Sequence, residues 1–216
     1  TIIFMKRLKA ILVLIAMSLT SFSAIASDTA VDRIYYDFDS ENKTAIVTYR
    51  GNSPYSYSDE YTGDVVIPAK VTYEGVEYAV AAIGESAFGR CSGLASITIS
   101  EGVTAIGDYA FSGCYGLTSI IVDENNTTYD SRNNCNAIIE TASNTLIVGC
   151  KLTVIPEGVK AIGKRAFSGC DGLTSITIPE SVTAIGVDAF FDCSGLTSIT
   201  IPEGVTAIGE RTFDGC

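Results

Sequence analysis

A nine-residue motif, Ile-Gly-x-x-(Ala/Thr)-Phe-x-x-Cys, occurs five times in this 216-residue chain. Where copies follow one another directly, they are 23 residues apart. A fixed period of this length is typical of stacked supersecondary units, because one unit cannot bury its apolar face alone. The sequence therefore predicts a solenoid, which offers an extended binding surface rather than an enclosed catalytic pocket. The copies span residues 83–91, 106–114, 162–170, 185–193 and 208–216.

The full repeat is clearest in residues 173–195. It opens with a short β-like stretch whose leucine and isoleucines point inward, then a Pro-Glu-Ser turn, then a second extended piece at residues 182–185. Residues 186–193 follow as a tight turn or a short helix with its alanine and phenylalanine inward. Stacked coils would align residues 176–178 beside 199–201 in a parallel sheet.

The start of the chain is typical of an exported protein. Three basic residues follow Met5, an apolar run spans residues 10–17, and an Ala-Ile-Ala sequence ends at Ala26. The apolar run is much shorter than the ~20 residues that a membrane span needs. We expect residues 1–26 to be a signal peptide that is cleaved after Ala26. The mature chain would carry no transmembrane segment and would lie at the cell surface or outside the cell, with the periplasm as an alternative.

The charge balance limits the class of partner. The chain has 14 Lys and Arg against 25 Asp and Glu, a net charge of −11, and removal of the three basic residues of the leader makes it −14. Phosphate recognition relies on clustered basic residues, so nucleic acid is excluded as a partner. A basic or neutral protein or glycoprotein is favoured.

Residues 27–82 precede the regular repeats, and we expect them to form an N-terminal cap with a degenerate first repeat. Residues 34–38 and 45–49 predict one hairpin, and residues 73–78 predict another. Eight of the 11 tyrosines lie between residues 35 and 78, which suits a cover with an apolar body and polar tips.

An insertion at about residues 123–151 interrupts the repeats. Residues 136–141 and 145–149 predict a hairpin that projects from the stack. Cys135 and Cys150 would face each other near its base. Sequence cannot give their Cα separation, so a disulfide between them stays an open question.

The repeats occupy residues 83–216, and the chain stops at Cys216, partway through a repeat. No C-terminal cap is visible, which would leave Ile208 and Phe213 facing solvent. We expect either a truncated chain or an end that a partner covers.

Five of the seven cysteines share one slot of the repeat, next to apolar positions. A free thiol packs there as a small hydrophobe, so we expect a reduced, buried ladder rather than disulfides. These residues are Cys91, Cys114, Cys170, Cys193 and Cys216.

Signals for enzyme chemistry are missing from the sequence. The chain has no histidine and none of the usual zinc, nucleotide-phosphate or hydrolase motifs. We therefore predict no enzyme activity, no catalytic residue, no cofactor and no metal. One repeat slot holds a file of carboxylates that could in principle serve a glycosidase, but exposed turn residues are the better interpretation. These are Glu101, Glu157, Glu180 and Glu203.

The outward positions of the predicted sheet carry small hydroxyl side chains, interrupted by Ile121. One interpretation is that Ser and Thr tolerate strands and keep the face soluble. The other is that the face is a docking surface for an extended partner. The candidate binding residues are Ser96, Thr98, Ser119, Ser175, Thr177, Ser198 and Thr200.

Tyrosine and serine together form a second candidate surface, in a loop before the cap strands. Tyr55, Tyr57 and Tyr61 lie among three serines there, a composition that suits adaptable contacts. The alternative is that the rings only cover the end of the core.

The stretch Leu-Thr-Ser-Ile-Thr-Ile-Pro-Glu-Gly-Val-Thr-Ala-Ile-Gly-x-x-x-Phe-x-x-Cys at residues 196–216 resembles the BspA-type leucine-rich repeat family of bacterial surface proteins. The resemblance covers residues 63–216. Residues 125–151 look like the irregular, hairpin-bearing repeat of some members. The resemblance implies a right-handed leucine-rich-repeat solenoid of short parallel strands and tight turns or short helical segments. The family has no shared catalytic motif and no consensus of binding residues, so the resemblance assigns no site in this chain.

The export signal, the repeats and the resemblance together predict a noncatalytic secreted or cell-surface recognition module. The leading hypothesis is an adhesin-like protein that binds host matrix or other cell-surface proteins. The alternative is a structural spacer or assembly component of a larger surface protein, and a carbohydrate-active enzyme is the third candidate.

Overall fold

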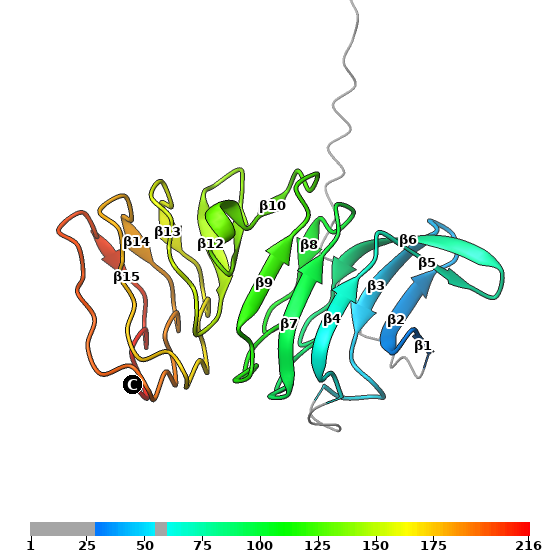
Figure 1. The fold of residues 1–216 in the computed structure, drawn as a ribbon, viewed down its shortest axis with the longest axis horizontal. Helices are drawn as coiled ribbons and strands as arrows, with labels where there is room; N and C mark the ends of the chain where they lie inside the picture. The colour runs from blue at the N-terminus through cyan, green and yellow to red at the C-terminus, as the bar shows by residue number, and fades with distance from the viewer. Residues whose placement is uncertain (1–28, 55–59) are drawn as a thin grey trace, which may run out of the picture.

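The computed structural model describes residues 29–54 and 60–216, so the expected signal peptide lies outside it. A row of strand-rich coils runs from the N-terminal hairpins to the last repeat (Figure 1). Within the described part, one 3-10 helix at Arg132–Asn134 is the only helical element, and no helix there could span a membrane. The strands are β1 (Ala30–Val31), β2 (Ile34–Asp39), β3 (Thr44–Thr48), β4 (Gly63–Ile67), β5 (Lys70–Tyr73), β6 (Val76–Ile83), β7 (Leu94–Ile99), β8 (Ala105–Ile106), β9 (Ser119–Val122), β10 (Tyr129–Asp130), β11 (Ala137–Glu140), β12 (Thr145–Gly149), β13 (Ala161–Ile162), β14 (Ala184–Ile185) and β15 (Ala207–Ile208).

The two predicted N-terminal hairpins are confirmed. Strands β2 and β3 pair antiparallel, and so do β5 and β6. Strand β3 then pairs parallel with the end of β6, with Val47 opposite Ile83, and β8 follows with Ile106 opposite Ile83. The hairpins thus lead directly into the first parallel rungs.

A second, parallel sheet has the order β4-β7-β9. Ile97 pairs with Ile120, one repeat later, and both are buried. The same ladder was expected at residues 176–178 and 199–201, but there it narrows to one bridge between Thr177 and Thr200. The prediction of a parallel strand pair at residues 176–178 and 199–201 is therefore confirmed only for Thr177 and Thr200.

The hairpin of the insertion is confirmed, but the expectation that it projects from the stack is wrong. Strands β11 and β12 pair antiparallel, and β12 also pairs parallel with β13, with Leu146 opposite Ile162. Ile138 and Ile139 both have no exposed surface, although they are adjacent and point to opposite faces of the strand. A strand that is apolar on both faces is stable only inside the stack.

Each Ile-Gly-x-x-(Ala/Thr)-Phe-x-x-Cys segment is a turn and not a short helix. The reason is that its fourth residue has φ between 51° and 57°, which a right-handed helix does not allow. These residues are Ser86, Tyr109, Arg165, Asp188 and Arg211.

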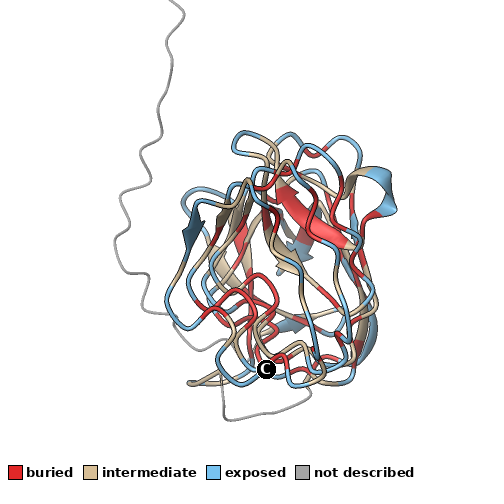
Figure 2. Ribbon diagram, turned by 90° about the vertical axis from the view of Figure 1, so that its left-hand side faces the viewer, coloured by how far each residue is buried: buried red, intermediate tan, exposed pale blue. Residues whose placement is uncertain are grey.

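The phenylalanines of successive turns stack. Ring centroids are 5.1 Å apart for Phe88 and Phe111, 5.0 Å for Phe167 and Phe190, and 5.6 Å for Phe190 and Phe213. Viewed along the stack, the coils surround a common interior (Figure 2). The repeats at residues 65–122 are called the first block and those at residues 152–216 the second block. The buried apolar residues form two clusters, one mainly in the cap and the first block and one mainly in the second block.

All seven cysteines are free thiols, and this includes Cys135 and Cys150, which are both buried. Three cysteines of the repeat slot donate from Sγ to the phenylalanine carbonyl of the preceding turn. Cys114 reaches Phe88 at 3.1 Å, and Cys193 reaches Phe167 at 3.1 Å. The expected buried ladder is confirmed only in part, because Cys91 and Cys193 are buried, Cys114 and Cys170 are partly buried, and Cys216 in the last turn is exposed.

Candidate functional site

The outward face of the β4-β7-β9 sheet is formed by alternate residues. Val66, Thr98 and Ile121 lie side by side in register, and their neighbours in sequence point into the core. A second row of the same face contains Ser96, whose Oγ donates to Asp64 Oδ1 at 2.5 Å. Ser96, Thr98 and Ser119 are half-buried, so solvent reaches only part of each side chain.

The same two rows continue in the second block of repeats. Ser175, Thr177, Ser198 and Thr200 are all exposed, and Thr177 pairs with Thr200. The structure therefore brings the predicted hydroxyl residues to one face of the molecule. We call this face the outward sheet face and define it by the two rows. The rows are Asp64, Ser96, Ser119, Leu152, Ser175 and Ser198, and Val66, Thr98, Ile121, Val154, Thr177 and Thr200.

Apolar residues occupy part of the outward sheet face. Val66 is 62% exposed, Ile121 51%, Leu152 55% and Val154 71%. Such residues, rimmed by polar ones, are typical of interaction surfaces. Sequence reasoning missed Leu152 and Val154, although they precede Ser175 and Thr177 by 23 residues and so share their slots.

The insertion supplies the rung between β9 and residues 152–155. The amide of Val122 donates to Ser131 Oγ at 2.9 Å, and the amide of Val154 donates to the Cys135 carbonyl at 3.0 Å. The segment between Ser131 and Cys135 therefore lies in the outward sheet face, and its Asn133 and Asn134 are exposed.

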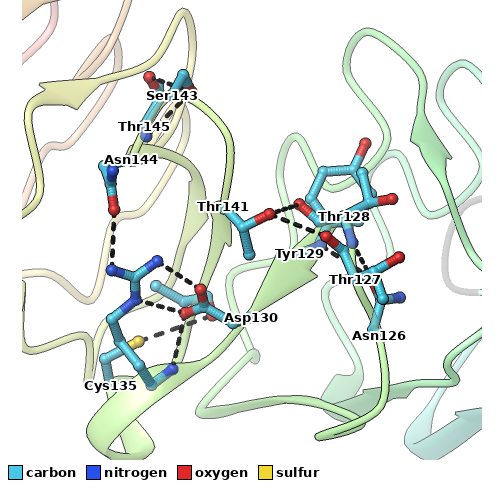
Figure 3. Close-up of polar contacts among 12 residues, drawn as sticks. Asn126, Thr127, Thr128, Tyr129, Asp130, Cys135, Thr141, Ser143, Asn144 and Thr145 are labelled. Carbon is cyan, nitrogen blue, oxygen red and sulfur yellow. Dashed lines mark hydrogen bonds and ion pairs between the residues drawn. The ribbon is translucent and has the colours of Figure 1, made fainter.

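Side-chain hydrogen bonds fix the shape of the insertion (Figure 3). Arg132 Nε donates to Asp130 Oδ1 at 2.7 Å, and its Nη1 donates to Asn144 Oδ1 at 2.9 Å. Thr141 Oγ1 donates to the carbonyls of residues 127 and 128. The rung is held rigidly, which favours a preformed surface.

Asn126 anchors the insertion to the first block. Its side chain is buried and donates to the carbonyls of Ser100 and Val103, at 2.9 Å each. Its Oδ1 accepts from the amides of Thr128 and Tyr129. All four hydrogen-bonding positions of the amide are filled.

The structure contradicts the tyrosine surface at Tyr61, the one of its three tyrosines that is described. Tyr61 is only 2% exposed, donates to the Thr48 carbonyl at 2.6 Å and packs on Phe88 with ring centroids 4.6 Å apart. It covers the end of the core and is not an accessible contact residue. Tyr55 and Tyr57 lie outside the described residues.

The file of glutamates gives no support for acid–base chemistry. Glu101, Glu157, Glu180 and Glu203 are all exposed turn residues. Among the residues that the structure describes, no group of three potential metal ligands is brought together.

A family model for the BspA type leucine rich repeat region matches residues 65–145 and 143–216, in six copies. No curated protein matches the chain significantly.

Several solved structures are similar to this chain. A leucine-rich repeat protein from Eubacterium ventriosum ATCC 27560 is 29% identical with a TM-score of 0.55, over 68% of this chain and 37% of that one. A leucine-rich repeat protein from Bacteroides ovatus ATCC 8483 is 33% identical with a TM-score of 0.46, over 86% and 38%. A leucine rich cell surface protein from Faecalibacterium prausnitzii A2-165 is 26% identical with a TM-score of 0.46, over 87% and 52%. The match thus spans between about a third and about half of each of these proteins.

Proposed function

Because this chain belongs to the BspA-type leucine-rich repeat family, we propose that it is a noncatalytic recognition module of the cell surface or the secreted fraction. The description of the Faecalibacterium relative as a cell surface protein supports this location. So does the export signal expected at residues 1–26. The partner is a protein or glycoprotein of host matrix or of another cell, so the module acts as an adhesin.

The outward sheet face is the observation that carries this function. It combines exposed hydroxyl residues with the apolar Ile121, Leu152 and Val154, and few charges lie on it. A weakly charged face desolvates at low cost, and the apolar residues supply the favourable term of association. The hydroxyl groups of Thr177 and Ser175 then fix orientation through hydrogen bonds.

The proposal includes the organisation of the chain. The cap occupies residues 27–82, the repeats occupy residues 83–216, and the insertion at about residues 123–151 starts their second part. The repeats form a right-handed solenoid with a 23-residue unit, which is supported by pairs such as Ile185 with Ile208. A solenoid of this kind presents its sheet as one continuous surface.

The test is binding of the purified chain to an immobilised panel of matrix glycoproteins, mucins and glycans, at low and at raised salt. Ile121→Lys and Val154→Lys place a charge within the outward sheet face, and we expect each to weaken binding at least tenfold. Thr72→Lys is the matched control, because Thr72 is exposed on β5 in the cap. Absence of binding by the folded chain, or binding that both face variants retain, would reject the proposal and favour a structural spacer.

A further inference from the structure

Neighbouring turns of the stack are joined by three backbone hydrogen bonds. The amides of Ser86, Phe88 and Arg90 donate to the turn at residues 106–114. The same three bonds join the turns of the second block. Donor and acceptor pairs are Ser86 to Asp108, Phe88 to Ala110, Arg90 to Ser112, Arg165 to Val187, Phe167 to Ala189, Gly169 to Phe191, Asp188 to Glu210, Phe190 to Thr212 and Asp192 to Asp214.

This ladder is broken once, between the turns at residues 106–114 and 162–170. By repeat equivalence the amides of Tyr109 and Phe111 point toward the next turn, yet in the described structure no backbone hydrogen bond joins these two turns. On the other side, the Ala166 carbonyl accepts from Gly149 of β12 at 2.7 Å. The carbonyl of Lys164, equivalent to that of Asp108, receives no backbone donor among the residues that are described.

The stack of phenylalanines is broken at the same place. Gly149 lies so close to the Phe167 ring that a Cβ on it would be 2.1 Å from the ring, so that face of Phe167 is covered. Phe111 is stacked on Phe88 on one face only. At the N-terminal end of the molecule, Tyr61 covers the equivalent face of Phe88.

A cavity of about 350 Å³ lies at this break, between the two blocks of repeats. Its volume is within the range of ligand pockets. It closes at one end, where a Cβ on Gly169 would lie 3.3 Å from the amide nitrogen of Gly113. Its apolar lining is Ile106, Phe111, Leu117, Ile147, Val148 and Phe167.

An exposed ion pair and a cation–π contact form the rim of the cavity. Lys164 Nζ lies 2.9 Å from Asp108 Oδ2, and the Arg165 guanidinium lies 3.9 Å from the centre of the Tyr109 ring. Pairs between exposed side chains contribute about 0–1 kcal/mol each. The Lys164–Asp108 pair can therefore separate at little cost when a ligand enters, whereas Arg165, which is 17% exposed and also lies 3.3 Å from the buried Asp188, stays in place.

We propose that this junction cavity binds a short extended peptide segment of a partner protein, with one aromatic side chain inserted beside Phe111. The carbonyls of the segment accept from the amides of Tyr109 and Phe111, and one of its amides donates to the Lys164 carbonyl. The segment adds the missing rung of the ladder, as a strand does in β-augmentation. This role rests on the proposed recognition function for its biological use, but it concerns a different site from the outward sheet face.

The probe is a fluorescein-labelled peptide with the sequence of residues 106–112, Ile-Gly-Asp-Tyr-Ala-Phe-Ser. Its binding to the full chain is followed by fluorescence anisotropy. We expect saturable binding that weakens at least tenfold when the phenylalanine of the peptide is replaced by alanine. Ile147→Phe fills the cavity and should weaken binding to the same extent. Thr177→Phe adds the same ring to the outward sheet face and should leave binding unchanged.

Hydrogen exchange gives a readout on the unaltered chain, which matters if the Ile147→Phe variant does not fold. The peptide should slow exchange at the amides of Tyr109 and Phe111. Equal binding of the alanine peptide, or no protection of these two amides, overturns the proposal. The two proposals fail separately, because Val154→Lys should weaken binding to the glycoprotein panel at least tenfold while the peptide still binds.

Discussion

The amide of Gly163 donates to the carbonyl of Leu146 at 2.7 Å, and the amide of Gly84 donates to the carbonyl of Val47 at the same distance. Both acceptors belong to the second strand of an antiparallel hairpin, and both face the first Ala-Ile rung of a block of repeats. The hairpin β11–β12 therefore begins the second block in the way that β2–β3 begins the first. It is an internal cap.

Leu146→Ala tests this role. The side chain has no exposed surface and belongs to the core cluster of the second block. Its truncation should lower the free energy of unfolding by about 3 kcal/mol, measured by urea denaturation. Hydrogen exchange should accelerate more in residues 161–216 than in residues 65–122. Leu152→Ala, at an exposed position, should cost less than about 0.5 kcal/mol; equal acceleration in both blocks would contradict the internal cap.

Asn126→Ala should lower the free energy of unfolding more than most substitutions of polar residues in this chain. It removes four hydrogen bonds at a buried site and leaves the carbonyls of Ser100 and Val103 without these donors. We expect a loss of about 2–4 kcal/mol in the free energy of unfolding. Asn125→Ala is the control, because Asn125 is exposed and its side chain bonds only to Asp123. A similar cost for both variants would show that burial of Asn126 does not matter.

The cysteines should differ in reactivity toward a thiol reagent at pH 8. Burial raises the pKa of Cys193 to about 12, so its reactive thiolate is scarce, and the thiol has no exposed surface. Cys216 is exposed. We expect Cys216 to react rapidly and Cys193 to react only after unfolding, as read from labelled peptides by mass spectrometry. Cys216→Ser should remove the rapid phase, and rapid labelling of Cys193 in the folded chain would disprove the buried ladder.

Asp37 and Asp39 on β2 should affect stability in opposite directions. Burial raises the pKa of Asp37 to about 6. Between its ordinary value of 3.8 and about 6, the folded chain holds a proton that the unfolded chain releases, so this group makes stability fall as pH rises through that window. Asp37→Asn should therefore raise the Tm at pH 7 and remove this dependence.

The pKa of Asp39 is lowered by hydrogen bonds from Asn42. Its contribution to stability is present at neutral pH and is lost as pH falls through the lowered pKa, so Asp39→Asn should lower the Tm at pH 7. Thermal unfolding of both variants from pH 3 to pH 8 checks the pair. Shifts of the same sign at pH 7 would contradict the burial of Asp37.

Periodicity predicted much of the fold because the same side chains recur in the same environment. The buried positions of Leu173 and Phe190 could be predicted from their repeats alone. The location of β12 could not, because a hairpin in isolation gives no sign of which outer edge will pair with a later strand. The local sequence predicts that Thr145 and Leu146 lie in a strand. Their pairing with Ala161 and Ile162 becomes visible only in the three-dimensional structure.

The candidate surface was predicted in part for a related reason. The hydroxyl positions Thr177 and Thr200 follow from alternation along a strand. Leu152 and Val154 were missed because they follow the insertion directly, where no leucine marks the start of the repeat. Tyr61 follows the alternative interpretation, since its ring is buried and covers the end of the core, although the tyrosine and serine composition around it also suggested a contact surface.

The two-residue rungs β13, β14 and β15 have a mechanical consequence. Each is joined to its neighbour through only two paired residues in that sheet, with the turn ladder alongside. A force that pulls on the C-terminal end loads these few bonds one rung at a time, so the last repeats would peel off in succession. Each detached 23-residue repeat adds roughly 75 Å to the contour length of the unfolded segment. Under such a load, the second block should therefore lengthen before the longer strands of the first sheets separate.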